Sequence, residues 1–324
     1  MESTKHDRLL EIFFRSLRGE DLSVQRLAKE YGVSTKSISR DINDLKSFLA
    51  DHRHLVGNTE LNYSSQDKCY RLHMDEFLTN RELFAMVEVM IGARAFSKEE
   101  LLTLTDKLKR FTTVEDRPKL NDLIRKELYH YSEVKHDCDS VMDTLWKLVN
   151  CISDKREVTI EYYRIDRAWR THRIRPASLM FTDHYFYLIA FKTDDEPSKP
   201  FYFRVDRIKY ITEHRKHFSA KEVGDFDEGL LRERSLFMWP GKLRTIRFEY
   251  SGTSVQAVLD KLPTAKIIER SGGKYTLEAE VYGDGIKMWI LSQGSRIKVT
   301  EPLEFVRELK EEILTMSNFY DDIK

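Results

Sequence analysis

Apolar residues recur at helical spacing along the first part of the chain. The run LLEIFFRSL at residues 9–17 predicts one helix. A second helix is expected between Ser23 and Gly32, because serine commonly caps a helix start and glycine commonly ends a helix. The pattern therefore predicts short helices separated by tight turns.

A third helix is expected to begin after Ser34. Its apolar residues Ile38, Ile42 and Leu45 fall at positions i, i+4 and i+7, so they form one stripe. Hydroxyl, amide and basic side chains occupy the helix start and the opposite face: Ser34, Thr35, Lys36, Ser37, Ser39, Arg40 and Asn43.

Two short helices joined by a glycine-containing turn are typical of a helix-turn-helix, whose second helix enters the DNA major groove. Lys36 and Arg40 can contact phosphates or guanine edges, and Asn43 can contact an adenine edge. The turn-rich run at residues 55–72 predicts a hairpin wing. A small helical packing module is the alternative interpretation, but the stripe, the caps and the wing together favour DNA binding.

The segment RLAKEYGVSTKSISRDINDL resembles the winged helix-turn-helix of DeoR-type bacterial regulators. Their S-x-x-[ST]-I-x-R-D-I core stands here as STKSISRDI, with Ser37 at the [ST] position. The resemblance supports duplex DNA as a partner of this segment.

Helical patterns continue over residues 78–111, where Ser97 and Glu100 predict a capping box before a second helix. A further helix is expected from about Asp139. Since nothing in this region has catalytic spacing, we expect a connector between the DNA-binding unit and the rest of the chain.

From residue 157 to 218 the pattern changes to short strands. VTIEYYRI alternates, THRIRPASLMF gives a strand expected to break at Pro176, and the aromatic runs HYFYLIAFK and FYFRVDRIKYI give two or three more. Consecutive short strands joined by acidic turns favour a small, strongly bent antiparallel sheet or barrel.

The last segment reads strand, helix, strand, strand, helix, strand, helix, with a hairpin at Gly272 and Gly273. This is the split βαβ pattern of a ferredoxin-like unit with one added helix. The chain is therefore predicted to be an α+β multidomain protein. Its predicted domains are a winged helix-turn-helix at 1–75, a helical connector at 76–138, a β-rich domain with a leading helix at 139–220 and a ferredoxin-like domain at 221–324.

The β-rich segment resembles that of WYL-domain transcriptional regulators. Their hallmark is a Trp-Tyr-Leu triplet on a strand, preceded by Arg-Pro and followed by Phe-Arg-x-Asp-Arg-Ile. The three pieces stand here as RIRPASLMF, YFYLIAF and FRVDRI, with Phe186 in place of the tryptophan. The resemblance covers nearly the whole chain, including the C-terminal extension that usually accompanies this domain.

This resemblance implies an Sm-like (SH3-type) β-barrel that senses a ligand, and several members bind nucleotides or single-stranded nucleic acid there. The ligand contacts implied by motif are Arg175, Tyr187, Arg204 and Arg207. An arginine fork suits phosphate and a tyrosine ring can stack on a base, although each of these residues could instead have a structural role. Because side chains alternate on a strand, one of the last two arginines is expected to be structural unless the strand ends or bulges between them.

Composition limits the other functions. The chain has 54 basic and 54 acidic residues, so DNA contact must come from a local basic face. No apolar stretch reaches the ~18 residues of a membrane span and the N-terminus lacks a signal peptide, so we expect a cytoplasmic protein without membrane contact. The three cysteines lack the spacing of a disulfide framework or a zinc ribbon.

No catalytic or metal motif is evident. The pairs around His52 and His136 have no second cluster at ligand spacing, and phosphate-binding loops, nucleophile elbows and zinc-protease motifs are absent from the sequence. We therefore expect neither an enzyme nor a cofactor.

Two functions remain. The first is a ligand-responsive, DNA-binding transcriptional regulator, expected to be a repressor and a homodimer, since helix-turn-helix proteins commonly pair to read two half-sites. The second is a sensor of nucleic acid or nucleotides that acts mainly through a protein partner.

Overall fold

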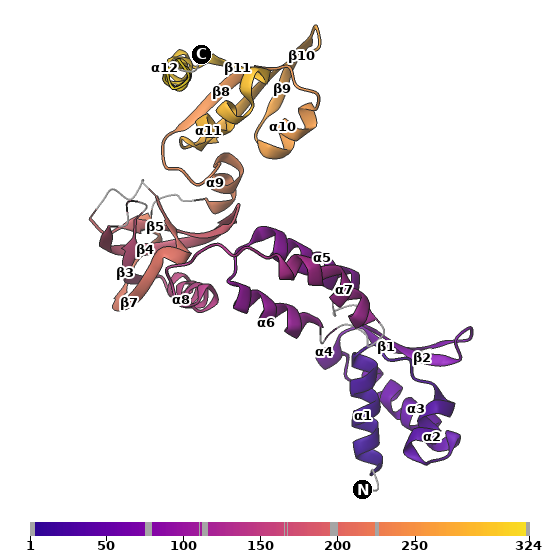
Figure 1. The fold of residues 1–324 in the computed structure, drawn as a ribbon. Helices are drawn as coiled ribbons and strands as arrows, with labels where there is room; N and C mark the ends of the chain where they lie inside the picture. The colour runs from indigo at the N-terminus through magenta and orange to yellow at the C-terminus, as the bar shows by residue number, and fades with distance from the viewer. Residues whose placement is uncertain are drawn as a thin grey trace. The chain divides into compact units, whose positions relative to one another are not determined.

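The computed structural model describes residues 4–74, 80–109, 111, 116–164, 166, 168–194, 200–223 and 227–321. The chain divides into two compact units, Met1–Lys135 and His136–Lys324, each described by itself below (Figure 1). Within the described residues, every helix is too short or too polar to cross a bilayer.

The N-terminal unit begins with the predicted helix-turn-helix and wing. Gly32 ends the second helix in the left-handed conformation, with φ of +65°, as its position predicted. The elements are α1 (Lys5–Leu17), α2 (Val24–Tyr31), α3 (Thr35–Asp51), α4 (Arg53–Val56), β1 (Thr59–Ser64) and β2 (Cys69–Met74).

One apolar core joins these elements. Ile38 and Ile42 are fully buried and Leu45 is nearly so, which confirms the predicted stripe of α3. The stripe packs with Ile12 of α1 and Leu61 of the wing.

Three helices form the connector: α5 (Asn80–Ala93), α6 (Lys98–Lys109) and α7 (Asp116–Tyr129). The predicted capping box before α6 is confirmed, because the Ser97 amide donates to the Glu100 carboxylate (3.1 Å) and the Glu100 amide donates to the Ser97 hydroxyl (3.2 Å). The sequence patterns did not predict α7, whose first turn contains Pro118.

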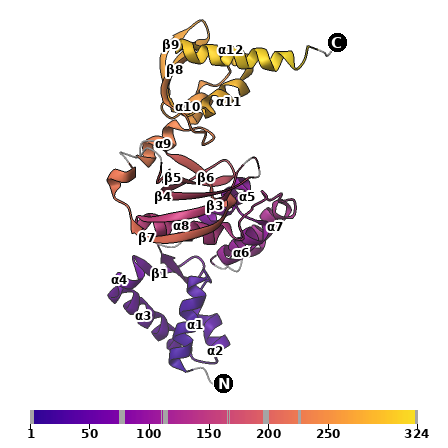
Figure 2. The ribbon, with the colours of Figure 1, turned by 90° about the vertical axis from the view of Figure 1, so that its left-hand side faces the viewer.

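The C-terminal unit starts with α8 (Val141–Ser153), which covers one face of a five-stranded antiparallel sheet (Figure 2). The strand order is β6-β5-β4-β3-β7, and among the described residues no strand pairing closes the sheet into a barrel. The strands are β3 (Arg156–Tyr163), β4 (Trp169–Thr182), β5 (Tyr185–Lys192), β6 (Phe201–Arg204) and β7 (Ile208–His217), with a 3₁₀ turn at Val205–Arg207.

Pro176 does not break its strand, contrary to the prediction. β4 continues through this residue, and the pairing with β5 shifts register between Pro176 and Ser178. A bulge accommodates the proline because it removes the need for one ladder hydrogen bond.

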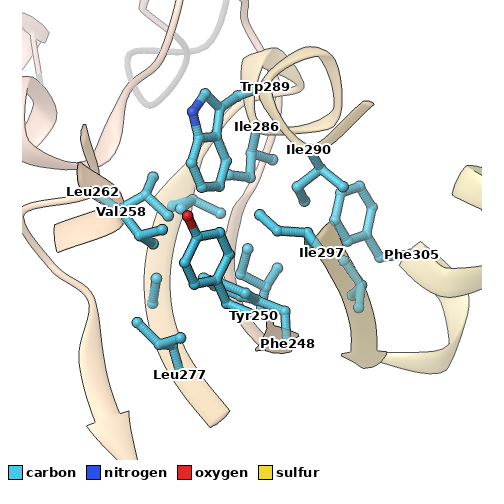
Figure 3. Close-up of a cluster of buried hydrophobic side chains, with 14 of the residues drawn as sticks. Phe248, Tyr250, Val258, Leu262, Leu277, Ile286, Trp289, Ile290, Ile297 and Phe305 are labelled. Carbon is cyan, nitrogen blue, oxygen red and sulfur yellow. The ribbon is translucent and has the colours of Figure 1, made fainter. Parts of the chain in front are cut away.

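The ferredoxin-like domain is confirmed. Its antiparallel sheet has the order β11-β8-β10-β9, and a core of Phe248, Trp289 and Phe305 lies between the sheet and the helices (Figure 3). After a 3₁₀ turn at Ala220–Val223, the elements are α9 (Glu228–Arg234), β8 (Leu243–Tyr250), α10 (Val255–Lys261), β9 (Lys266–Ser271), β10 (Lys274–Tyr282), α11 (Gly285–Ser292), a 3₁₀ turn at Gly294–Arg296, β11 (Ile297–Glu301) and α12 (Leu303–Asn318).

Candidate nucleic-acid interface and ligand site

The polar residues predicted to read DNA lie on α3 and at its N-cap, on the side away from the buried stripe. An outward face of basic and amide groups can reach base edges when the helix enters a groove. The exposed members are Ser34, Thr35, Lys36, Arg40 and Asn43, and the half-buried members are Ser37 and Ser39.

The start of α3 is capped as predicted. The Ser37 amide donates to the Ser34 hydroxyl (3.1 Å), and the two hydroxyl oxygens lie 2.9 Å apart. This cap holds the first turn, whose remaining backbone amides and helix dipole favour a phosphate.

A buried ion pair fixes α3 against α1. The Arg8 Nε donates to Asp41 Oδ2 at 2.6 Å, and the Asp41 side chain is only 1% exposed. This hydrogen bond raises the pKa of Arg8 above its ordinary value. In the R-D-I motif, Arg40 therefore faces solvent while Asp41 anchors the helix.

The wing is attached to the segment between α1 and α2. Leu22 and Tyr70 exchange two backbone hydrogen bonds of 2.9 Å. Arg71 donates to both carboxylate oxygens of Asp21, at 2.6 and 2.8 Å, and this lowers the pKa of Asp21. Helix α3 and the wing are thus held by one framework.

Two cations of α3 are not neutralised within the protein. Lys36 and Arg40 have no ion pair among the residues that the structure describes, whereas Arg8 and Arg71 are paired with carboxylates. The unpaired charges lie on the predicted DNA-reading face, so a chain of zero net charge still presents a local basic surface.

In the C-terminal unit, the structure brings Tyr187 and Arg204 together. They are cross-strand partners on β5 and β6, and both are half-buried. The Arg204 guanidinium lies 3.3 Å from the ring centroid of Tyr185 and donates to both carboxylate oxygens of Asp206, at 3.0 and 2.6 Å. Asp206 and Tyr185 thus hold the guanidinium beside the Tyr187 strand.

Tyr187 also contacts an apolar cluster on this face of the sheet. The cluster is formed by Met180, Ile189, Leu231 and Met238. Burial raises the pKa of Tyr187 to about 12, so the phenol stays protonated at physiological pH. A neutral ring beside a held guanidinium can stack on a base while the cation meets a phosphate.

Arg175 lies in a different cluster. Its Nε is 3.4 Å from Glu157 and its Nη2 is 3.2 Å from Glu222, and the arginine is 9% exposed. Across the sheet it pairs with Phe191, four residues along β5 from Tyr187. Arg175, which the Arg-Pro motif suggested as a ligand contact, thus lies between two carboxylates, as Arg204 lies beside Asp206.

Glu157 is the centre of this second cluster. Its side chain is 1% exposed and also pairs with Arg173 (2.9 Å) and Lys216 (2.8 Å). Burial alone would raise the pKa of Glu157, but the hydrogen bonds and charges of Lys216 and Arg173 outweigh burial and lower it. The cluster joins β3, β4 and β7.

Arg207 lies outside both clusters. Strand β6 ends at Arg204, and Val205–Arg207 forms a 3₁₀ turn, so strand alternation does not assign these two arginines to opposite faces. Arg207 is half-buried and has no ion pair among the described residues.

Two residues of these clusters were missed from the sequence. Tyr185 lies two residues before Tyr187, so strand alternation places both on one face, but its contact with Arg204 was not predicted. Glu157 offered no such signal, because its burial depends on partners far along the chain. No group of three or more potential metal ligands occurs in the described part of the chain.

Three family models match the chain. They are an HTH domain at residues 7–52, a WYL domain at 143–213 and a WCX domain at 243–317. The HTH and WYL models describe regulatory rather than enzymatic domains. No curated protein matches the chain.

Two solved structures have a weak likeness to the chain. One is proteasome accessory factor B/C (PafBC) of Arthrobacter aurescens, with 16% identity and a TM-score of 0.31 over 99% of this chain, which spans 50% of that one. The other is a CRISPR Cas-related protein, with 14% identity and a TM-score of 0.39 over 94% of each chain.

Proposed function

Because the chain belongs to the WYL-domain helix-turn-helix transcriptional regulators, we propose that it binds operator DNA through α3 and that a ligand of its WYL domain controls this binding. The observation that carries the proposal is the outward face of α3, where Lys36 and Arg40 stand unpaired among the described residues while Asp41 anchors the helix.

On DNA, α3 is proposed to enter the major groove. Arg40 and Asn43 contact base edges, and Lys36 with the hydroxyls of the first turn contacts phosphates. The neighbouring wing, held by Arg71 and Asp21, contacts the adjacent backbone. The contacts of α3 use its exposed face, which lies opposite its buried stripe.

In the WYL domain, Tyr187 and Arg204 are proposed as the principal ligand contacts, with Arg207 as a second cation. The ligand class is anionic and base-bearing, either a nucleotide or single-stranded nucleic acid, because the site offers a ring beside a held guanidinium. Arg175 is proposed as a further ligand contact at a separate point of the sheet, where Glu157 and Glu222 lie 3.4 and 3.2 Å from its guanidinium.

We assign the protein to the cytoplasm, as a homodimeric repressor of transcription. Two-fold pairing would present two copies of α3 to two half-sites about one helical turn apart. The ligand can control DNA binding only if it binds one arrangement of the DNA-binding units better than the other, because only such a difference in affinity shifts the equilibrium between the two arrangements.

The test is selection of genomic DNA fragments by the full chain in excess non-specific competitor. We expect a few fragments that share a two-fold symmetric sequence and that are released by the ligand. If no fragment is enriched, the DNA-binding proposal is wrong. In that case, capture of a protein partner whose binding depends on the ligand of the WYL domain would favour a sensor that acts through protein contacts.

A further inference from the structure

One segment of the C-terminal unit contacts both the WYL sheet and the ferredoxin-like domain. We call it the strap and define it as residues 219–223 and 227–238, which include a 3₁₀ turn and helix α9. The end of the strap is fixed to β10, because Arg234 forms an ion pair with Glu280 and a parallel bridge to the same strand follows. A movement of the strap would therefore move together with the ferredoxin-like domain.

Glu222 of the strap is an anion that contacts Arg175. Its carboxylate lies 3.2 Å from the Arg175 guanidinium and 4.0 Å from the Lys216 ammonium. The hydrogen bonds that Ser219 donates, together with the charges of Arg175 and Lys216, lower the pKa of Glu222, so the carboxylate is ionised at neutral pH. The Glu222 side chain is 36% exposed, whereas Glu157, on the same arginine, is 1% exposed. Glu222 is thus the carboxylate that an anion from solvent can replace.

The strap also contacts Tyr187. Leu231 and Met238 of the strap are buried in one apolar cluster with Met180 and Ile189 of the sheet, and the Tyr187 ring packs against this cluster. A base can stack on a tyrosine only where the face of the ring is free of other side chains. Apolar side chains of the strap therefore occupy space beside the ring that a base would need.

The two contacts lie on one face of the sheet. Arg175 pairs across the sheet with Phe191, which lies four residues after Tyr187 on β5. Since side chains at an even spacing share a face, Arg175 and Tyr187 point to the same side and are about 13 Å apart along the strand direction. One segment of the chain therefore contacts two of the proposed ligand residues, with an anion at one and apolar groups at the other.

We propose that the strap is a built-in competitor of the WYL ligand. Its Glu222 carboxylate takes the place of a phosphate on Arg175. Its apolar side chains, Leu231 and Met238, take the place of a base beside Tyr187. An anionic, base-bearing ligand then binds by displacing the strap, and this displacement separates the ferredoxin-like domain from the sheet. The inference rests on the proposed ligand site and states how that site is regulated.

The strap can leave the sheet without unfolding either neighbour. The apolar cluster that holds it is separate from the core under α8 and from the core of the ferredoxin-like domain. The ion pair that holds it includes a partly exposed carboxylate, which water screens. Segments held by few contacts of this kind have the low local stability that ligand-driven movements require.

Titration of the full chain with a fluorescein-labelled single strand of about ten thymidine nucleotides tests the competition. Glu222→Gln removes the competing charge, so it should tighten binding of this probe about threefold to fivefold. The matched control is Glu213→Gln, which changes the net charge equally. Glu213 is also on the WYL sheet, where its side chain is 42% exposed and lies 3.5 Å from Arg156, so the control should leave the affinity unchanged.

A second pair of variants tests the contact with Tyr187. Leu231→Ala removes apolar contacts that hold the strap on the sheet, so it should tighten binding of the probe at least about fivefold. Leu230→Ala is the control, because Leu230 is the preceding residue of α9, is 42% exposed and lies outside the cluster. This control should bind the probe as the natural chain does.

Amide hydrogen exchange distinguishes a competitor from a part of the binding site. Saturation of the natural chain with the probe should raise exchange in α9 at least about tenfold, while the amides of β4 and β5 stay protected. Slower exchange in α9 on binding, or an unchanged affinity in both Glu222→Gln and Leu231→Ala, would overturn the inference and leave the ligand site in place. Absence of probe binding in every variant would contradict the proposed ligand class, and the inference with it.

Discussion

Removing Arg8 should loosen the recognition helix by a large and calculable amount. Arg8→Ala deletes the cation that lies 2.6 Å from Asp41, whose side chain is 1% exposed. Breaking a buried ion pair by removing one partner costs about 3–5 kcal/mol, because the remaining charge is left without compensation. We therefore expect the packing of α1 against α3 to lose about this much stability.

The same two helices supply a matched control. Lys5 and Asp44 also join α1 to α3, at 2.8 Å, but their side chains are 56% and 50% exposed. Water screens such a pair, so Lys5→Ala should cost about 0–1 kcal/mol. The two variants therefore differ mainly in burial, with nearly equal distances.

Amide hydrogen exchange in the full chain measures this local stability. Since each 1.4 kcal/mol is about a tenfold change, exchange in α1 and α3 should rise roughly 100-fold to 3,000-fold in Arg8→Ala and less than about tenfold in Lys5→Ala. Amides of the WYL sheet should be unchanged in both. Equal, small changes in the two variants would refute the reasoning that burial makes Arg8–Asp41 an anchor.

Three further results are expected. Arg204→Ala combined with Arg207→Ala should abolish the effect of a nucleotide ligand yet leave operator affinity intact, and undiminished ligand binding would refute the site. The pKa of Glu157 lies below its ordinary 4.5. Its pairing with Lys216 therefore stabilises the fold above pH 4.5, and this stabilisation is lost as the pH falls through the lower pKa of the folded state. Glu157→Gln should flatten this part of the acid unfolding curve. Burial raises the pKa of Tyr187 to about 12, so Tyr187→Phe should not change the tyrosine absorbance titration below about pH 11. Loss of a component that titrates near pH 10 in this variant would instead show that the Tyr187 ring is exposed.

Local patterns predicted much of this architecture. The stripe of Ile38, Ile42 and Leu45, the Ser34 cap and the hairpin at Gly272 depend on residues a few positions apart, and each appears in the structure. The order of strands and helices in the ferredoxin-like domain could be read from the sequence, because each consecutive element had a clear hydrophobic period. The exposed face of α3 followed from the same stripe, because the opposite side of an amphipathic helix must face outward.

Long-range partners could not be predicted in the same way. The ion pairs of Arg175 with Glu157 and Glu222 join residues that lie 18 and 47 positions apart in the chain, so no local pattern predicts them. Helix α7 was missed because its pattern is weak and Pro118 reads as a break, although proline is tolerated in a first turn. Burial and pairing of charges depend on which strands and helices meet.

The most direct test of the account is the affinity of Arg40→Ala for a selected operator. Arg40 lies on the exposed face of α3, and its loss should weaken operator binding about 5-fold to 150-fold, or roughly 1–3 kcal/mol, without lowering thermal stability. Arg53→Ala serves as the control, since Arg53 is an exposed arginine on α4, outside the recognition helix. Operator affinity that is unchanged in Arg40→Ala, or a fold that collapses with it, would contradict the claim that α3 reads DNA.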